Sequence, residues 1–296
     1  MSIKSLGFNE INNRAIKLRQ IATGYPSQQT SAIQPAAAKF LQSNPLAPVI
    51  AVICDQQITS EDAWAFPFWL YNQLGGGSFT ATSIYKLGQV ALKNHLKTYL
   101  SGKWPSGMSA DDQEKYLNDI SSYIINACHL IADQFADNPD NMFKLGNYNV
   151  PQVYFILRSL PGVGAKKAAM IARDFAMSAG SWFLGLSSRL KQNLRMDFKV
   201  NGKHLSEVPV DVHVVEVFGR MMGEFRKTPQ RSRFPNYSPD IQNLAKLAFP
   251  DFPSKLDEIL WAVGREYCNE REPACDECPL HDLPCEYGRG KVKVVI

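Results

Sequence analysis

Four cysteines near the end of the sequence constrain this chain more than any other feature. Cys268, Cys275, Cys278 and Cys285 lie within 18 residues and are separated by six, two and six residues. Four thiolates this close along a chain can converge on one metal centre. The spacing alone fits a tetrahedral zinc site as well as a four-iron, four-sulfur (4Fe-4S) cluster, since Cys-x2-Cys pairs serve both.

Length and composition describe an ordinary globular chain. Its 296 residues are 45% hydrophobic and 20% charged, which is enough for one large or two small domains. The net charge of +4 is compatible with a polyanionic partner but does not by itself indicate one. The sequence shows no secretory signal and no apolar run of membrane-span length, so we expect a cytoplasmic, nucleoid-associated protein. In that setting crowded cysteines indicate a metal rather than disulfides.

Helical periodicity dominates the hydrophobic pattern. It predicts several helices over about 48–157, a pair over 150–159 and 165–177, and further helices after Asp211 and over 255–268. The exception is an Asn201-Gly202 pair between short alternating runs, which predicts a two-residue β-hairpin turn. The expected fold class is therefore all-α, with one small β-hairpin.

A glycine-containing link joins the paired helices. In Leu160-Pro161-Gly162-Val163-Gly164 the two glycines lie two residues apart at the mouth of a helix. Such a turn can direct backbone N–H groups at an oxyanion such as a DNA phosphate. A Gly-x-Gly before a helix is also found in ordinary helix links.

The cysteine segment CNEREPACDECPLHDLPCEYG resembles the cluster loop of the endonuclease III family, which binds a 4Fe-4S cluster. The last gap is one residue longer here, which leaves ligation plausible and changes the local loop. The family's first inter-cysteine loop is basic and rests on DNA. The resemblance therefore implies a phosphate contact by Arg271, weakened by the flanking Glu270 and Glu272.

The glycine link, read as LPGVGAKKA, is similar to the helix-hairpin-helix of endonuclease III and 8-oxoguanine glycosylase. Their nucleophile is a lysine two residues beyond the second glycine, where this chain has Lys166. The resemblance implies Schiff-base chemistry at Lys166 and DNA contacts by Gly162, Val163 and Gly164. A solvated helix lysine is the alternative for Lys166. Lys167, about 100° further around the helix, is expected to be a phosphate contact or a surface charge.

The string VPVDVH resembles that around the essential aspartate of 8-oxoguanine glycosylase. Asp211 also precedes an apolar periodic run, so we expect it to cap a helix. The resemblance implies that its carboxylate stabilises positive charge on the sugar or helps to deprotonate the lysine. His213 is expected to brace the helix. Lys166 and Asp211 lie farther apart in this sequence than the corresponding residues of the family. The extra residues, in 179–207, either extend the DNA footprint or form a solvated surface insertion.

The string ICDQQITSEDAW resembles the loop that supplies an amide side chain to the gap left by an extruded base. Gln57 aligns with that residue, and Gln56 is its neighbour. An inserted amide can bond the orphaned partner base, which offsets part of the unstacking free energy. Nearby aromatic residues, such as Trp64 and Phe66, are expected to belong to the core.

These resemblances imply the two-module helix-hairpin-helix glycosylase fold. We expect a six-helix barrel over 46–178, an arm over 1–45 packing with a cluster module over 208–296, and an insertion at 179–207. Lys166 and Asp211 would face each other across the intervening cleft.

The implied function is base excision repair. A monomer would flip and excise a damaged or modified base from double-stranded DNA and, as a lyase, cleave the abasic site. A monofunctional glycosylase that uses water, and a non-catalytic DNA-binding protein with a structural cluster, stay as alternatives. The base is left open among oxidised purines, oxidised pyrimidines, modified cytosine and mismatches. An adenine glycosylase is less favoured, because that family usually has serine at the Lys166 position.

Overall fold

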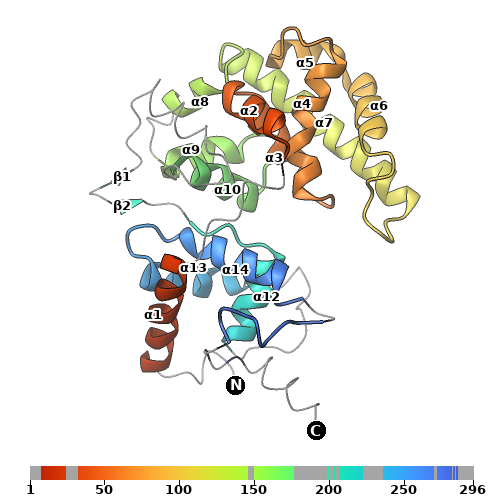
Figure 1. The fold of residues 1–296 in the computed structure, drawn as a ribbon. Coiled ribbons are helices and arrows are strands. Elements are labelled where there is room, and N and C mark those ends of the chain that lie inside the picture. The colour runs from red at the N-terminus through yellow and green to blue at the C-terminus, as the bar shows by residue number, and fades with distance from the viewer. Residues whose placement is uncertain are drawn as a thin grey trace. The chain divides into compact units, whose positions relative to one another are not determined.

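The structure, a computed structural model, is helical apart from one short hairpin (Figure 1). It describes residues 8–24, 33–145, 150–176, 199–200, 203–204, 207–222, 236–269, 272–281, 283 and 285. The chain divides into two compact units, Gln28–Phe198 and Met1–Ser27 with Lys199–Ile296. The predicted all-α class with a small β-hairpin is confirmed.

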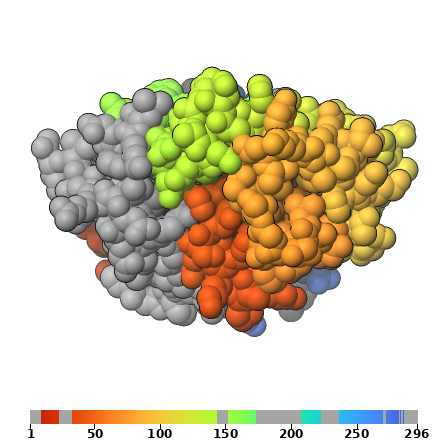
Figure 2. Space-filling model, turned by 90° about the horizontal axis from the view of Figure 1, so that it is seen from above, coloured from red at the N-terminus to blue at the C-terminus, as the bar shows by residue number. Residues whose placement is uncertain are grey.

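The unit Gln28–Phe198, called the barrel unit below, is built from helices throughout its described part. They are α2 (Pro35–Ser43), α3 (Ala47–Cys54), α4 (Ser60–Gln73), α5 (Ala81–Leu87), α6 (Gln89–Tyr99), α7 (Ala110–Gln134), α8 (Asp140–Leu145), α9 (Val150–Arg158) and α10 (Ala165–Ala176). Helix α3 is central, because it packs against α2, α4, α7 and α10 and all of its residues are buried. Figure 2 shows the surface around α2, in red-orange, beside the orange helices that follow it.

Side-chain caps explain where several of these helices begin. The hydroxyls of Thr59, Thr80 and Ser109 each accept a hydrogen bond from the backbone N–H three residues further on. Each hydroxyl thereby satisfies a donor that the first turn of a helix leaves without an intrahelical partner. These caps fix the starts of α4, α5 and α7.

The strong apolarity of α3 follows from its central place in the core. No single described helix is long and apolar enough to cross a membrane. Helices α2 and α3 meet the length and composition limits only when joined across a bend of 119°. Burial of every α3 residue inside the protein accounts for this composition.

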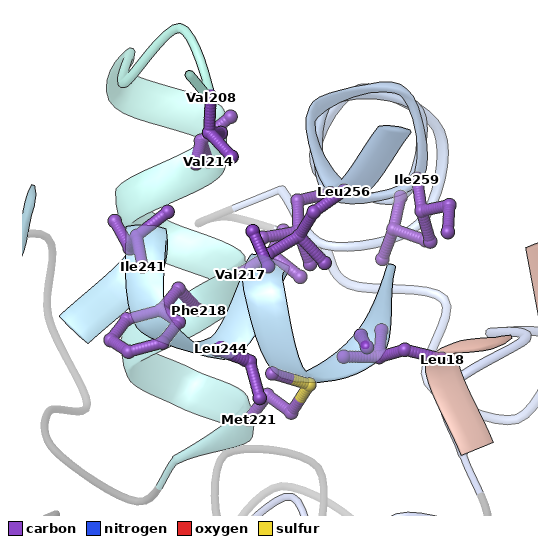
Figure 3. Close-up of a cluster of buried hydrophobic side chains, with 14 of the residues drawn as sticks. Leu18, Val208, Val214, Val217, Phe218, Met221, Ile241, Leu244, Leu256 and Ile259 are labelled. Carbon is purple, nitrogen blue, oxygen red and sulfur yellow. The ribbon is translucent and has the colours of Figure 1, made fainter. Parts of the chain in front are cut away.

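The other unit, called the cluster unit below, has a helical core and carries the cysteine loop. Its described elements are α1 (Phe8–Gly24), β1 (Lys199–Val200), β2 (Lys203–His204), α12 (Val212–Met221), α13 (Ser238–Ala248) and α14 (Lys255–Glu266). Figure 3 shows side chains of all four helices turned toward one another, with Phe218 and Val217 of α12 among Ile241 of α13, Leu256 of α14 and their neighbours. Helix α1 is thus part of this core although it comes from the opposite end of the sequence.

Two arginines of α1 fasten it to the ends of other helices. Arg14, which is 2% exposed, donates to the carbonyl of Met221 at 3.2 Å. Arg19 donates to the carbonyls of Ala248 at 2.8 Å and Leu247 at 3.0 Å. Carbonyls in the last turn of a helix lack intrahelical donors, and a cation there also complements the helix dipole. These bonds fix α1 to α12 and α13.

The units divide the expected N-terminal arm. Only α1 joins the cluster unit, whereas α2 packs against α3 and α4 of the barrel unit. The hairpin pairs Lys199 with His204 and Val200 with Lys203, which is the register of a two-residue turn at 201–202. The turn itself and residues 177–198 of the insertion region lie outside the described residues.

Close packing of α12 on α14 depends on a glycine. A Cβ atom on Gly264 would lie 2.7 Å from the Cβ of His213. The imidazole of His213 also meets the Trp261 ring edge-on, with 6.4 Å between centroids. His213 therefore packs between the two helices as a bracing side chain.

Candidate functional site

Asp211 caps the start of α12. Its carboxylate accepts a hydrogen bond from the backbone N–H of Val214 at 2.9 Å, which confirms the predicted helix cap. The residues before it are held by Gln242, whose side chain bonds both the N–H and the carbonyl of Val208 at 2.9 Å. The carboxylate therefore has a fixed position at the N-terminus of α12.

The four cysteines gather at one side of the cluster unit. Cys268 lies two residues after the end of α14, and both Cys268 and Cys278 pack against the apolar core. Burial, with a smaller contribution from the neighbouring thiols of Cys268, Cys285 and Cys275, raises the pKa of the Cys278 thiol to about 11. Backbone bonds fold the loop back on itself: the Cys278 N–H bonds the Cys275 carbonyl at 3.3 Å, and the Ala274 N–H bonds the Tyr267 carbonyl at 2.9 Å.

A buried arginine contacts this group of thiols. Arg220, in the last turn of α12, donates from Nη1 to the Sγ of Cys268 at 3.2 Å and also to the carbonyl of Cys268. The thiol of Cys285 lies 3.6 Å from the carbonyl of Arg220. Burial raises the pKa of Cys268, and the Arg220 guanidinium opposes this shift. The guanidinium thus favours a thiolate at Cys268.

The spacing of the four cysteines allows two metal centres, a zinc ion or a 4Fe-4S cluster. Among the described residues, no three ligating side chains converge as they would around a single ion. In a 4Fe-4S cluster each thiolate binds a different iron, so the four sulfurs stand farther apart than around one zinc ion. Four thiols in partly apolar surroundings, one of them hydrogen-bonded to a guanidinium, fit such a cluster. The loop between Cys268 and Cys275 is closed by Asn269, which bonds the backbone of Glu272, whereas Arg271 lies outside the described residues.

In the barrel unit, the hairpin link forms a turn between α9 and α10. Gly162 has a φ of +77°, and a Cβ atom there would lie 2.8 Å from the Tyr123 side chain. Gly164 is exposed, and a Cβ atom there would meet only Arg158 Nη1, at 3.9 Å. Val163 between them is buried. Gly162 is therefore required by the turn and by close packing, while Gly164 leaves an open face in front of α10.

Lys166 lies in the first turn of α10, next to this open face, and is half-buried. Its charge acts on Asp55, the residue that follows α3. Burial raises the pKa of the Asp55 carboxyl, and the positive charges of Lys166 and then Lys167 oppose that shift. The Asp55 carboxylate, in the same unit, is therefore within electrostatic range of the candidate nucleophile.

Lys167 is buried, with 7% of its surface exposed. Its Nζ donates to the carbonyls of Ile53 at 2.7 Å and Gly162 at 3.1 Å, and to Oε1 of Gln56 at 3.1 Å. Burial lowers its pKa to about 8. The surface-charge interpretation of Lys167 is wrong, because its position on α10 turns it toward the end of α3. A phosphate contact would require the ammonium to leave these three acceptors.

The two glutamines after α3 differ in their surroundings. The Gln56 amide is engaged by Lys167, whereas Gln57 is exposed and has a left-handed backbone with φ of +61°. Trp64 and Phe66 are 2% and 1% exposed, which confirms their assignment to the core.

No protein-family model and no curated protein sequence matches the chain. Solved structures do match along nearly the whole length. A non-covalent endonuclease III–DNA complex is 16% identical, with a TM-score of 0.57 over 93% of this chain and 95% of that one. A trapped endonuclease III–DNA covalent intermediate is also 16% identical, with a TM-score of 0.56 over the same shares. This chain has the endonuclease III fold. A thermostable thymine-DNA glycosylase shares that fold, at 13% identity and a TM-score of 0.53 over 95% of this chain and 98% of that one.

Within the endonuclease III fold of this chain, the barrel unit brings together Lys166, Lys167, the hairpin glycines and the glutamine loop. The cluster unit holds Asp211 and the cysteines. Asp55 and Arg220 were not predicted as site residues from the sequence. Asp55 had one local signal, an acidic residue directly after the apolar run 47–54. Arg220 had none, because its partner Cys268 lies 48 residues away along the chain.

Proposed function

We propose that this chain is a DNA glycosylase of base excision repair that flips a damaged or modified base out of duplex DNA and excises it. The observation that carries the proposal is Lys166, in the first turn of α10 directly behind the exposed Gly164. This arrangement places an amine beside backbone N–H groups that can bind a phosphate. A monomer then suffices to hold one strand and react with it.

Lys166 is the proposed nucleophile. Its neutral amine attacks C1′ of the extruded nucleotide, the C1′–N bond breaks, and the base leaves as it takes up a proton. Ring opening gives a Schiff base between Nζ and C1′, and loss of a C2′ proton then expels the 3′ phosphate. The near carboxylate of Asp55 can accept the proton that Lys166 releases.

Asp211 is the proposed electrostatic partner in this reaction. As the glycosidic bond breaks, positive charge develops on the sugar, and a fixed carboxylate stabilises it. Its helix cap keeps the carboxylate oriented without further reorganisation. A monofunctional enzyme, in which Asp211 activates water instead, is the second candidate.

Backbone contacts supply affinity in this proposal, and the cysteine loop supplies rigidity. Gly162 and Gly164 offer N–H groups to a phosphate, whereas the N–H of the buried Val163 already bonds the Leu160 carbonyl at 3.1 Å and Val163 supports the turn. Arg271 adds a cation from the cysteine loop. The ligands of the proposed 4Fe-4S cluster are Cys268, Cys275, Cys278 and Cys285. When bound, the cluster cross-links this loop and performs no step of the excision. Iron content and broad visible absorbance test it, since zinc is colourless.

Borohydride reduction separates the possible functions. The protein is incubated with a duplex that contains one abasic site, and borohydride then reduces any Schiff base to a stable covalent complex. Covalent capture indicates lyase chemistry, and base release without capture indicates a monofunctional enzyme. Binding with neither outcome, across duplexes that carry oxidised purines, oxidised pyrimidines, modified cytosine or mismatches, would contradict a glycosylase.

A further inference from the structure

A buried ammonium joins the end of α3 to the hairpin turn. The three protons of Lys167 Nζ match its three acceptors, on Ile53, Gln56 and Gly162. Ile53 and Lys167 are 114 residues apart in the sequence. One side chain therefore connects two of the segments that carry the proposed DNA contacts.

The end of α3 is held by other groups as well. The Tyr116 hydroxyl donates to the carbonyl of Cys54 at 2.8 Å, and the N–H of Asp55 bonds the carbonyls of Ala51 and Val52. With the Lys167 bond included, each of the last four carbonyls of α3 has a donor, although a helix leaves these groups without intrahelical partners. The glutamine loop thus leaves α3 from a fixed point.

This anchoring distinguishes the two glutamines. The amide oxygen of Gln56 accepts from Lys167, so its side chain is directed toward the hairpin. Gln57 is exposed, and its φ of +61° is a conformation that a non-glycine residue holds only where its surroundings impose it. Gln57 is therefore the amide presented to solvent.

The position is unfavourable for a lysine if stability alone is considered. The ammonium belongs to the first turn of α10, where the helix dipole disfavours a cation, and burial removes its hydration. The nearby Asp55 carboxylate offsets part of this penalty. A well-packed apolar side chain would avoid both effects. A positional role explains why a lysine is present.

We infer that Lys167 is a positioning residue for base extrusion. It fixes Gln57 relative to the hairpin turn, so that the Gln57 amide enters the gap left by an extruded base while the hairpin binds the backbone. The ligand is duplex DNA with an unpaired base opposite the gap, and the amide bonds that base. The inference rests on the proposed function.

The test uses the full-length protein and a duplex with a tetrahydrofuran abasic analogue opposite 2-aminopurine, which fluoresces more strongly when it is unstacked. Lys167→Met removes the ammonium and retains the length of the side chain, whereas Gln57→Ala removes the amide. Both variants should lose the fluorescence rise and bind this duplex about tenfold more weakly, as expected for one lost hydrogen bond. Their affinity for undamaged duplex should fall less. Lys115→Met, an equal charge change at an exposed site on α7, is the matched control.

Each other result has a defined meaning. If Lys167→Met keeps the full rise while Gln57→Ala loses it, the inference is overturned and the proposed function stands. A purely structural lysine would lower the melting temperature and both duplex affinities together, which also overturns it. Should Lys167→Met not fold, Gln56→Ala decides, because it should keep more of the rise than Gln57→Ala, and the reverse order refutes the inference. If wild type shows neither a rise nor a preference for the abasic duplex, the proposed function itself fails.

Discussion

Arg220 donates a hydrogen bond from Nη1 to the Sγ of Cys268 at 3.2 Å, and the same nitrogen bonds the Cys268 carbonyl. Arg220 is 1% exposed and belongs to α12, the helix that Asp211 caps. One helix therefore holds the candidate catalytic carboxylate at its start and contacts the cysteine loop at its end. A structural change in the cysteine loop should therefore alter the position of Asp211, because α12 connects the two.

Arg220→Met should lower both metal content and stability. It removes charge-assisted hydrogen bonds from a buried site, which contribute about 1.5–3 kcal/mol each, and leaves the Cys268 thiolate without its cation. Iron per chain and the urea midpoint measure the two effects. Arg265→Met is the control, because Arg265 is exposed and lies over the Trp261 ring, 5.1 Å from its centroid. Equal iron content in both variants would show that Arg220 does not support the site.

Gly162→Ala should mainly lower stability, whereas Gly164→Ala should mainly weaken DNA binding. Alanine at 162 would be strained at a φ of +77° and would collide with Tyr123, so stability should fall by roughly 1–3 kcal/mol. Alanine at 164 meets only Arg158 Nη1 at 3.9 Å, so folding should be nearly unaffected. Its methyl group would instead stand on the face that we propose binds a phosphate.

DNA affinity completes the comparison of the two glycines. Gly164→Ala should weaken binding to damaged and undamaged duplexes by the same factor, since backbone contacts carry no base information. Thermal melting and a binding titration on each duplex are the measurements. If the affinity for undamaged duplex is unchanged, the turn between α9 and α10 is not part of the DNA interface.

Local signals were sufficient for part of this site. Asp211 could be assigned to a helix cap because a cap is defined by residues three positions apart. The β-hairpin at 199–204 could likewise be predicted from the residues of its turn. Lys167 could not be placed, because helical spacing gives the angle between Lys166 and Lys167 but does not say which of them faces α3. That depends on Ile53 and Gln56, more than 100 residues earlier in the sequence.

The burial of Lys167 predicts a dependence of stability on pH. Burial lowers its pKa from 10.5 to about 8, so between these values the unfolded chain binds more protons than the folded one. Stability should therefore rise with pH across that window, relative to a variant without this lysine, by about 3 kcal/mol at most. Urea unfolding of wild type and Lys167→Met from pH 7 to pH 10.5 measures the difference. Cys54, whose pKa burial raises to about 12, has the opposite effect in both proteins, although Lys167→Met also removes the Lys167 charge that lowers the Cys54 pKa. A difference that stays constant with pH would contradict this prediction.

Lys166→Gln and Asp211→Asn should separate the two proposed chemical roles. Lys166→Gln removes the amine but leaves the hairpin glycines in place, so borohydride capture on an abasic duplex should vanish while the affinity for that duplex survives. Asp211→Asn keeps an oxygen that can accept the Val214 N–H bond, so folding should change little. Base excision should fall by about 100-fold or more, because the charge that stabilises the sugar cation is lost.

The comparison is sharpest on a preformed abasic site. There no glycosidic bond is left to break, so Asp211→Asn should retain much more of its strand-cleaving activity than of its excision activity, whereas Lys166→Gln should lose both. Single-turnover rates on the two substrates give this ratio directly. If borohydride still captures Lys166→Gln on the abasic duplex, another amine must be the nucleophile. Lys167→Met in that background would then test whether the neighbouring amine can leave its three acceptors and react in place of Lys166.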